Sequence, residues 1–329
     1  MGTWVYLHAR EYDRSVKMKN THKLTEGAVL LAAYAVLILM TVYIPVLGIV
    51  TNFFLAVPFI LYAAKNTILN SFVFFIVACF ISFIVGSIVA IPFTFSFGLT
   101  GLVMGYFIQK NKSRSSSFIA ATLAFLGTII VQYVAAIALF QFNLIEEVFT
   151  LMKETINRSI SMIETLGQNI DVTPLKQMLE TIPLLEVLTP SLFVTTALMI
   201  VFIIEIVSYP IVKRFGVNLA SAKPFRELTL PKSILWYYLI TMLATFIMKP
   251  EEGTYWFTAL VNIGFILQLL MVIQGLSFIY FICYQKGIPK AVPIIATILT
   301  FLMPFFLSIV RILGIIDLGF DLRKRLNTK

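Results

Sequence analysis

The chain is organised as long apolar runs separated by short polar segments. A helix that spans the hydrocarbon core of a bilayer needs about 20 apolar residues, within a range of about 17–25. Most runs reach this length, whereas the second is short and is bounded by Asn52 and Lys65. The pattern predicts an all-α, polytopic transmembrane helix bundle with eight or nine spans. The expected spans are 27–50, 52–64, 69–91, 92–108, 118–140, 190–212, 234–248, 254–284 and 291–316.

Composition agrees with this pattern. The 329 residues are 59% hydrophobic and 12% charged, whereas soluble domains are about 45–50% apolar and about 25% charged. So few polar residues exclude a soluble enzyme, a nucleic-acid-binding module and a disordered chain. The net charge of +9 lies mainly between the apolar runs, so the expected partner is the lipid bilayer and no nucleic acid.

Basic residues predict the topology, because Lys and Arg are enriched in cytoplasmic segments. Three basic segments are all cytoplasmic if the N-terminus is inside and each run crosses once. The segment 141–189 is then outside, with seven acidic and three basic residues. We therefore expect a bacterial plasma-membrane protein with a cytoplasmic N-terminus; Met18 is an alternative start, which would make residues 1–17 an upstream extension. The basic residues are Arg10, Arg14, Lys17, Lys19 and Lys23, then Lys110, Lys112 and Arg114, then Lys213, Arg214, Lys223, Arg226 and Lys232.

The last apolar run does not follow this rule. A single crossing would place the basic tail 323–329 outside. Pro293, Pro304 and Gly314 interrupt the run, and Arg311 lies within it. We expect a broken segment that enters the membrane and returns, which leaves the tail cytoplasmic. Broken backbone at membrane depth needs protein or a watery cavity around it, so this segment should pack inside the bundle.

The external segment has a helical pattern. Its apolar residues recur every three or four positions, which is the helical period. Gly167, Gln168 and Asn169 interrupt this first helix, and Thr173 with Pro174 predicts the start of a second one. The pair forms either a structural cap or a lid over an outward-facing site. The periodic residues are Ile145, Phe149, Met152, Ile156, Ile160, Ile163 and Leu166.

Charged residues within the spans need a specific reason, since each costs about 2.5–3.5 kcal/mol on insertion scales. Glu205 and Arg311 are the clearest examples. They either form a buried pair, or Glu205 protonates or meets a substrate. Together with Gln132 they form the candidate intramembrane polar site. Neutral polar residues that favour contacts between helices are Asn70, Gln132, Asn262, Gln268 and Gln274.

Small residues mark two helix faces. Gly98, Gly101 and Gly105 predict close helix packing. Ala28 and Ala32 form a second small face, which could meet another helix of this chain or of a partner.

No catalytic, metal-binding or cofactor-binding residue is predicted. Both histidines, His8 and His22, precede the first span, and Cys79 and Cys283 are far apart within apolar runs. No Ser-His-Asp set, metal-ligand cluster or glycine-rich phosphate loop occurs. Asp317, Asp321 and Glu205 are too scattered to specify a reaction, so we expect no enzyme and no cofactor.

Three segments resemble one family. They are KLTEGA at 23–28, FRELTLP at 225–231 and LGIIDLGFDLRKR at 313–325. Together they are similar to the YybS-like family of uncharacterised multi-pass membrane proteins from Gram-positive bacteria. The similarity runs from about Met18 to the C-terminus, and the closing segment is its most specific part.

A broader likeness concerns the first six spans. IPVLG at 44–48, NFFLAVPF at 52–59 and GLTG at 98–101 resemble the S components of energy-coupling-factor transporters. In that family a six-helix bundle holds a vitamin near its outer face, under a loop that here would be 48–52. Small residues on the first helix dock onto a coupling subunit, and Ala28 and Ala32 match their spacing. The short loop, the external segment and the extra C-terminal spans depart from that family.

We therefore expect a transporter-like protein that binds a small molecule or lipid-linked metabolite in an S-component-like bundle. Its partner would be the coupling subunit of a transporter or another membrane protein. The alternative is a membrane scaffold or regulator that acts through its external helices and cytoplasmic loops. The expected parts are a cytoplasmic tail 1–26, a six-span bundle 27–212 that includes 141–189, a basic loop 213–233, C-terminal spans 234–317 and a basic tail 318–329.

Overall fold

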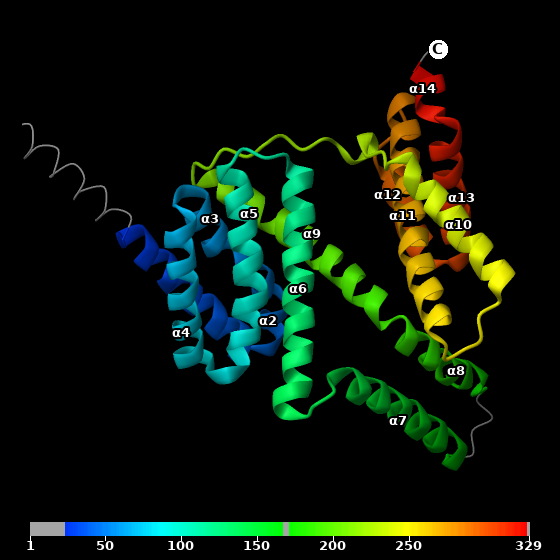
Figure 1. The fold of residues 1–329 in the computed structure, drawn as a ribbon, viewed down its shortest axis with the longest axis horizontal. Coiled ribbons are helices and arrows are strands. Elements are labelled where there is room, and N and C mark those ends of the chain that lie inside the picture. The colour runs from blue at the N-terminus through cyan, green and yellow to red at the C-terminus, as the bar shows by residue number, and fades with distance from the viewer. Residues whose placement is uncertain (1–23, 167–170, 328–329) are drawn as a thin grey trace, which may run out of the picture. The chain divides into compact units, whose positions relative to one another are not determined.

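The computed structural model describes residues 24–166 and 171–327, which are mostly helical and contain no strand. The all-α expectation is confirmed for these residues. Nearly all of the expected tail 1–26, and the interruption at 167–169, lie outside them. The helices (Figure 1) are Leu24–Tyr43, α2 (Pro45–Thr51), η1 (Asn52–Phe54), α3 (Ala56–Lys65), α4 (Ile68–Phe93), η2 (Thr94–Gly98), α5 (Leu99–Gln109), α6 (Arg114–Phe140), α7 (Leu144–Thr165), α8 (Thr173–Val187), α9 (Thr189–Arg214), η3 (Phe225–Glu227), α10 (Lys232–Met248), α11 (Tyr255–Gln285), α12 (Ala291–Leu302), α13 (Pro304–Phe320) and α14 (Leu322–Asn327).

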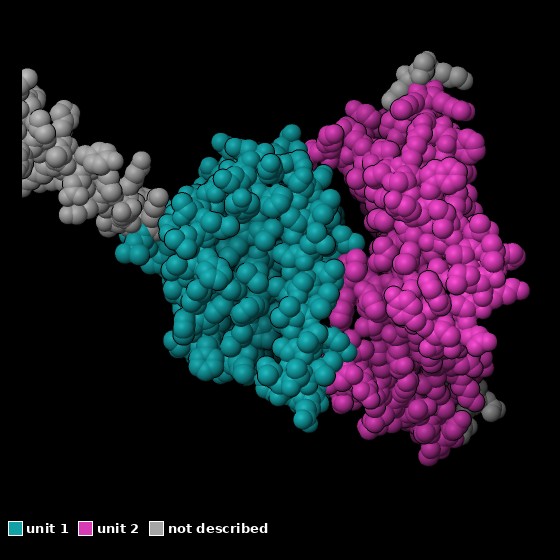
Figure 2. Space-filling view, viewed as in Figure 1, with its two compact units in different colours: residues 1–142, 196–221 teal, residues 143–195, 222–329 magenta. Residues whose placement is uncertain are grey.

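The chain forms two compact units (Figure 2). Unit 1 is residues 1–142 and 196–221, and unit 2 is residues 143–195 and 222–329. The expected parts, which placed 141–189 with the first six spans, stay a prediction. Within unit 2 the Asn262 side chain on α11 donates from its Nδ2 to Val187 O at 2.7 Å. Its Oδ1 accepts a hydrogen bond from Ser191 N at 3.0 Å, so α8 and the start of α9 are held to the C-terminal helices.

Six helical segments of the described chain are long and apolar enough to cross a membrane, and the bent pair α12–α13 would make seven. The expected count of eight or nine spans is therefore not confirmed. Two causes are visible. The expected spans 69–91 and 92–108 belong to one continuous helical segment, Ile68–Gln109, and α10 has only 17 residues.

The segment Ile68–Gln109 folds back on itself. As a straight helix its 42 residues would measure about 63 Å, about twice the hydrocarbon thickness of a bilayer. The chain instead turns at Ser87, whose φ of 57° and ψ of −162° are not helical. The hydroxyls of Thr94 and Ser82 then lie 2.7 Å apart, and Figure 1 shows the chain reversing between α4 and α5. The two arms therefore form a helical hairpin.

Two glycines of α5 let α3 and α5 approach closely in unit 1, and a third, Gly98 of η2, lies against α4. A Cβ at Gly101 would lie 2.7 Å from Ala56 O, and one at Gly105 would lie 2.6 Å from Ala63 Cβ. At Gly98 it would lie 2.9 Å from the Phe75 ring. Such distances are too short for real Cβ atoms, so larger residues here would separate the helices.

An even closer crossing joins α11 and α13 in unit 2. A Cβ at Gly275 would lie 1.9 Å from Val310 O, and a Cβ at Gly314 would lie 2.0 Å from Met271 O. Both neighbours are backbone atoms, which cannot rotate away as a side chain can. Gly314, which in the sequence only interrupts an apolar run, is half of a helix crossing in the structure.

The last apolar stretch is bent by 118° between α12 and α13. The Gln285 side chain, at the end of α11, donates to Leu326 O at 2.7 Å, just beyond the end of α13. The two ends of the bent pair therefore return to the same neighbourhood. Because the 12 residues of α12 rise about 18 Å, too little to cross the hydrocarbon core, this geometry favours a re-entrant segment.

The expectation that this segment packs inside the bundle is only half right. α13 packs on α11, but Phe301, Leu302 and Phe305 at the bend are exposed in this chain. The bend exposes little unsatisfied backbone, since Pro304 has no N–H to satisfy. Met303 O also accepts a hydrogen bond from Phe306 N at 3.0 Å. The backbone at the bend therefore needs no other part of the chain to cover it.

The helices α7 and α8, which the sequence predicts to lie outside the membrane, pack on each other within unit 2. Phe149, Ile156 and Ile160 are buried together with Ile182 of α8. Lys153 Nζ pairs with Glu186 Oε1 at 2.6 Å across the two helices. The amphipathic pattern and the start of α8 at Thr173 are both confirmed.

The glycine crossing in unit 2 gives the first prediction. Gly275→Leu or Gly314→Leu should destabilise the protein by at least about 1–3 kcal/mol, the usual cost of overpacking, because backbone atoms block the new side chain. Thermal unfolding in detergent measures the effect as a lower Tm. Gly264→Ala, on the same helix α11, is the matched control: its Cβ would meet only Thr241 Cγ2 at 3.9 Å. The glycine crossing would be contradicted if the Tm of Gly314→Leu equalled that of the control.

Candidate functional site

A cluster of buried hydroxyl groups lies in unit 1, where the helical hairpin turns. Tyr34 of the first helix, Ser82 of α4 and Thr94 of η2 are fully buried. The Tyr34 hydroxyl lies 2.9 Å from Ser82 Oγ and 2.7 Å from Thr94 Oγ1. With the Ser82–Thr94 contact this closes a triangle of three hydrogen-bonded hydroxyls. The triangle joins three segments that are far apart in the sequence.

A second set of polar groups continues from η2 towards α6. Gln132 Nε2 donates to Ser96 Oγ at 3.1 Å and lies at the same distance from Pro92 O. Thr128 Oγ1 lies 3.4 Å from Ser96 Oγ. We call the six residues of both sets the polar layer: Tyr34, Ser82, Thr94, Ser96, Thr128 and Gln132.

The backbone is irregular at the same place. η2 is a π-helical turn, Thr94–Gly98, and π-helical bulges are frequent at functional sites. Ser87 has a positive φ with an extended ψ, a region used almost only by glycine, which costs of order 1–3 kcal/mol. Such strain is retained where the surrounding structure imposes it, and it gathers at binding sites. Irregular backbone and polar side chains therefore coincide in unit 1.

More polar groups lie at the end of unit 1 that carries the turn. The Tyr43 hydroxyl donates to Val85 O at 3.0 Å, which places the end of the first helix beside the turn at Ser87. Thr41 and Thr51 share a hydrogen bond of 2.9 Å. The buried amide oxygen of Asn52 has no hydrogen-bond partner in the described residues. Asn52 falls within the segment 48–52, which was expected to be a covering loop but is helical in the structure, in α2 and η1.

The chemistry of the polar layer is that of neutral donors and acceptors. It contains hydroxyls and one amide but no acid and no base. It therefore suits hydrogen bonds to an uncharged polar group rather than proton transfer or ion pairing. Among residues 24–166 and 171–327, no group of three or more His, Cys, Asp or Glu could hold a metal ion.

Glu205 has a different partner from the expected one. It forms an ion pair with the Arg114 side chain from the start of α6. Arg114 also lies over the Tyr209 ring, 4.5 Å from its centroid. Arg311 belongs to unit 2, where its Nη1 donates to Gln268 Oε1 at 2.8 Å. Sequence spacing did not favour Arg114, because it lies just before the expected span at 118–140.

The pair is one end of a small polar face on α9. Tyr209 donates from its hydroxyl to Ser117 Oγ at 3.4 Å. Ser208, fully buried, has a hydroxyl with no hydrogen-bond partner in the described chain. Gln132 is 18 residues beyond Arg114 on α6, about 27 Å along the helix axis. Glu205, Arg311 and Gln132, the expected polar site, thus each have partners of their own: Arg114, Gln268 and Ser96.

Unit 2 contains a denser network. Asp317 is buried, and its Oδ2 accepts from Arg323 Nε at 2.9 Å and from Gln274 Nε2 at 2.5 Å. The Gln274 side chain in turn accepts from Leu230 N at 2.9 Å. Arg323 Nη1 donates to Arg226 O at 2.8 Å. The segments 225–231 and 313–325, on which the family resemblance rests, therefore meet around one buried carboxylate.

Asp321 lies at the edge of this network. Its Oδ2 accepts from Lys232 Nζ at 2.5 Å. This hydrogen bond lowers the pKa of the Asp321 carboxyl below its ordinary value. Asp317 and Asp321 thus both stabilise the position of the 225–232 segment. Asp317 does so through Gln274 and Arg323, and Asp321 does so directly through Lys232.

Ala28 and Ala32 are exposed on the first helix, on the face that also carries Val29 and Val36. The described chain leaves this small-residue face uncovered. Gly101 and Gly105 lie in the α3–α5 contact described above, and Gly98 lies against the Phe75 ring of α4.

Five members of the polar layer, all but Gln132, and the role of Arg323 could not be predicted from the sequence. Single Ser, Thr and Tyr residues within apolar runs give a weak signal, since most of them bond to their own helix. The turn at Ser87 had no Gly or Pro pair to mark it. The nearest signal was Pro92, which follows the turn by five residues.

The Arg114–Glu205 pair gives the second prediction. Arg114→Ala should destabilise the protein by about 3–5 kcal/mol, because it leaves the buried Glu205 carboxylate without compensation. Glu205→Ala should cost less, since Arg114 is about one-third exposed and can reach water. A double-mutant cycle of unfolding free energies measures the coupling.

Arg311→Ala is the matched control. Its effect should add to that of Glu205→Ala, because the two residues have separate partners. Additivity between Arg114→Ala and Glu205→Ala, with coupling to Arg311 instead, would overturn the assignment.

Comparisons with known proteins agree with the resemblance seen in the sequence. The model of the family described as "Predicted membrane protein (DUF2232)" matches residues 32–318. The "Uncharacterized protein YybS" of Bacillus subtilis (strain 168) is 33% identical over 313 residues, which are 94% of this chain and 99% of that protein. No solved structure matches the chain. The likeness to S components is shown neither by the family model nor by the relative. The chain therefore belongs to the DUF2232 family of predicted multi-pass membrane proteins.

Proposed function

We propose that unit 1 binds a small molecule, or the polar part of a lipid-linked metabolite, and that the protein is transporter-like. The observation that carries this proposal is the polar layer, where six neutral polar side chains gather beside a π-helical turn within an apolar bundle. Such residues are costly in a membrane protein unless they have a partner, and they commonly mark substrate pathways. The unpaired amide oxygen of Asn52 at the same end of unit 1 adds an acceptor that a ligand donor would satisfy.

The orientation supports an outward-facing site. Residues 110–114 and 213–214 are both basic, and the Arg114–Glu205 pair brings the start of α6 to the second half of α9. We propose that this basic end is cytoplasmic in a bacterial plasma membrane, with the N-terminus on the same side. The α4–α5 hairpin has its turn, at Ser87, at the end far from this basic end. The polar layer would then face the outer half of the bilayer, where S components hold their vitamin.

A second candidate function is a membrane scaffold or regulator. The observation that favours it is the α7–α8 hairpin, which has its own buried core and leaves Leu144, Val148 and Leu151 exposed on α7. A protein partner would cover these side chains. This function requires no ligand in the polar layer.

The third prediction distinguishes the two functions. The full-length protein is purified in mild detergent, and retained small molecules are identified by mass spectrometry. Ser96→Ala and Gln132→Leu should each lower the amount retained by about tenfold, as expected for the loss of one good hydrogen bond. Neither change removes packing from the hydroxyl triangle, so both variants should remain folded.

Thr122→Val is the matched control for this experiment. Thr122 is a buried residue on α6 whose hydroxyl bonds back to Phe118 O at 2.9 Å, outside the polar layer. Its retained ligand should equal that of the wild type. A wild-type protein that retains no compound, or equal retention in all variants, would reject the ligand-binding proposal and favour the scaffold.

The fourth prediction concerns the exposed face of the first helix. If the protein works as an S component, Ala28 and Ala32 would contact a coupling subunit. Ala28→Trp should then remove that subunit and its ATPases from the purified complex, since a large side chain prevents close approach of two helices. Ile119→Trp, on the exposed face of α6, should leave the complex intact. Failure of the wild type to co-purify with a coupling subunit rejects this mode of coupling.

A further inference from the structure

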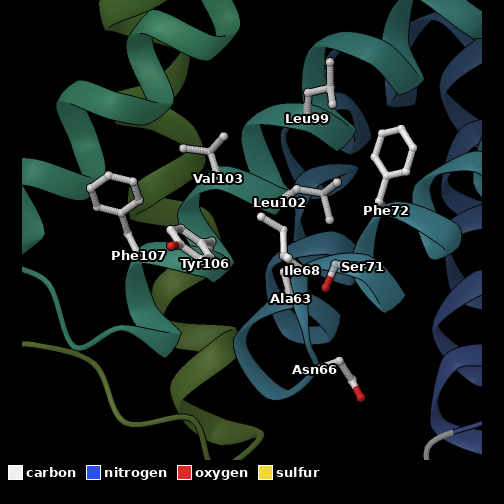
Figure 3. Close-up of a pocket in the computed structure, with 10 residues that line it drawn as sticks. All are labelled: Ala63, Asn66, Ile68, Ser71, Phe72, Leu99, Leu102, Val103, Tyr106 and Phe107. Atoms are coloured by element: carbon white, nitrogen blue, oxygen red, sulfur yellow. The ribbon is translucent and has the colours of Figure 1, made fainter.

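An apolar crevice lies in unit 1, between the end of α3, the start of α4 and the end of α5 (Figure 3). Its volume is about 220 Å³. A dry apolar cavity of about 150 Å³ is enough to bind benzene, so this crevice suits a short length of hydrocarbon. It runs from Leu99, which directly follows η2, to Asn66 at the end of the hairpin arms opposite Ser87. Its lining is Ala63, Asn66, Ile68, Ser71, Phe72, Leu99, Leu102, Val103, Tyr106 and Phe107.

Asn66 provides a polar group at one margin of the crevice. Its side chain is buried, and its Nδ2 donates to Tyr62 O at 3.1 Å. Its backbone O accepts from Gln109 Nε2 at 2.6 Å. The Oδ1 atom has no hydrogen-bond partner in the described chain. Figure 3 shows Asn66 below the apolar residues, with its amide oxygen directed away from them.

This unpaired oxygen needs a donor. A buried acceptor without a partner costs about 1–3 kcal/mol. Exchanging the oxygen and nitrogen of the Asn66 amide would not satisfy the oxygen. It would then face Tyr62 O, which is an acceptor and has no proton to donate. A hydroxyl or ammonium group at this margin would satisfy Oδ1.

Positive charge lies beside the same crevice. The Lys110 ammonium is 5.8 Å from the centre of the Tyr106 ring, and Tyr106 is one of the lining residues. Lys112 and Arg114 follow directly in the chain. If this basic end is cytoplasmic, as proposed above, these residues would attract anionic lipid headgroups, which are abundant in the cytoplasmic leaflet.

We propose that this crevice binds one acyl chain of an anionic phospholipid whose headgroup carries a hydroxyl. The acyl chain lies against Leu99, Leu102 and Phe72. The headgroup hydroxyl donates to Asn66 Oδ1, and Lys110 lies near the lipid phosphate. A phospholipid of this kind matches three features of the site. The crevice lining is apolar, Asn66 Oδ1 at its margin is an unpaired acceptor, and Lys110 beside the crevice is a cation. A wholly apolar ligand would leave Oδ1 unpaired, and water alone would leave the apolar lining unfilled.

Binding to three lipids with identical acyl chains tests the proposal. Phosphatidylglycerol is anionic and has headgroup hydroxyls, phosphatidylmethanol is anionic without a donor, and phosphatidylcholine has neither feature. The delipidated full-length protein is titrated with each lipid, and bound lipid is counted by native mass spectrometry. Phosphatidylglycerol should bind about fivefold more tightly than phosphatidylmethanol, which is the effect of one hydrogen bond of about 1 kcal/mol. Phosphatidylcholine should bind most weakly.

Three variants separate the contributions. Asn66→Leu should abolish the preference for phosphatidylglycerol over phosphatidylmethanol, whereas Lys110→Gln should reduce the preference of both over phosphatidylcholine. Leu102→Trp should weaken all three by filling the crevice, and Val103→Phe repeats this test at a second position. Leu123→Trp, on the exposed face of α6, is the control and should bind as the wild type does.

Two results would overturn the proposal. One is equal binding of phosphatidylglycerol and phosphatidylmethanol to the wild type, which would leave Asn66 without a role. The other is unchanged lipid binding in both crevice-filling variants, which would mean that the lipids bind only to the general surface of the protein. Neither result depends on the polar layer, so the proposed transport function is tested separately.

Discussion

Lipid tails offer no hydrogen bonds, so a polar group that this chain places in the bilayer is costly unless it finds a partner. Regular helices satisfy this constraint for the backbone. Side chains satisfy it only through packing: Glu205 requires Arg114, Asp317 requires Arg323 and Gln274, and Tyr34 requires Ser82 and Thr94. Each partnership joins at least two helical segments. The hydrogen-bonding needs of a few residues therefore determine which helices meet.

The same constraint explains where the helices can break. At Ser87 the chain reverses beside a triangle of hydroxyls, and at Met303 it bends just before a proline that has no N–H to satisfy. Glycines make the complementary contribution, since Gly101 and Gly275 allow backbones to approach where no side chain would fit. In the membrane, close backbone contact and buried hydrogen bonds stabilise helix packing. In a soluble protein, burial of apolar surface from water provides that stabilisation.

The two units use polar residues differently. In unit 2 the buried network around Asp317 is fully occupied by the 225–232 segment and by Arg323, so it stabilises the fold. In unit 1 two buried amide oxygens, those of Asn52 and Asn66, have no partner in the described residues, and they lie at opposite ends of the hairpin arms. Unpaired acceptors are where a molecule from outside the chain can gain binding energy. This difference is why both binding proposals concern unit 1.

The sequence by itself determined the class of protein, the all-α architecture, the family, and the starts of helices such as α8 at Thr173. These features depend on composition and on neighbours within one helix, which spacing along the chain specifies. Only the tertiary structure decided that Glu205 meets Arg114 rather than Arg311, that Gly314 packs on Met271, and that residues 143–195 form one compact unit with 222–329. The physical reason is that contacts between helices depend on how they pack, and an apolar run of a given length is compatible with many neighbours. The turn at Ser87 shows this most clearly, because its position is set by the hydroxyls of Tyr34, Ser82 and Thr94 meeting across three segments.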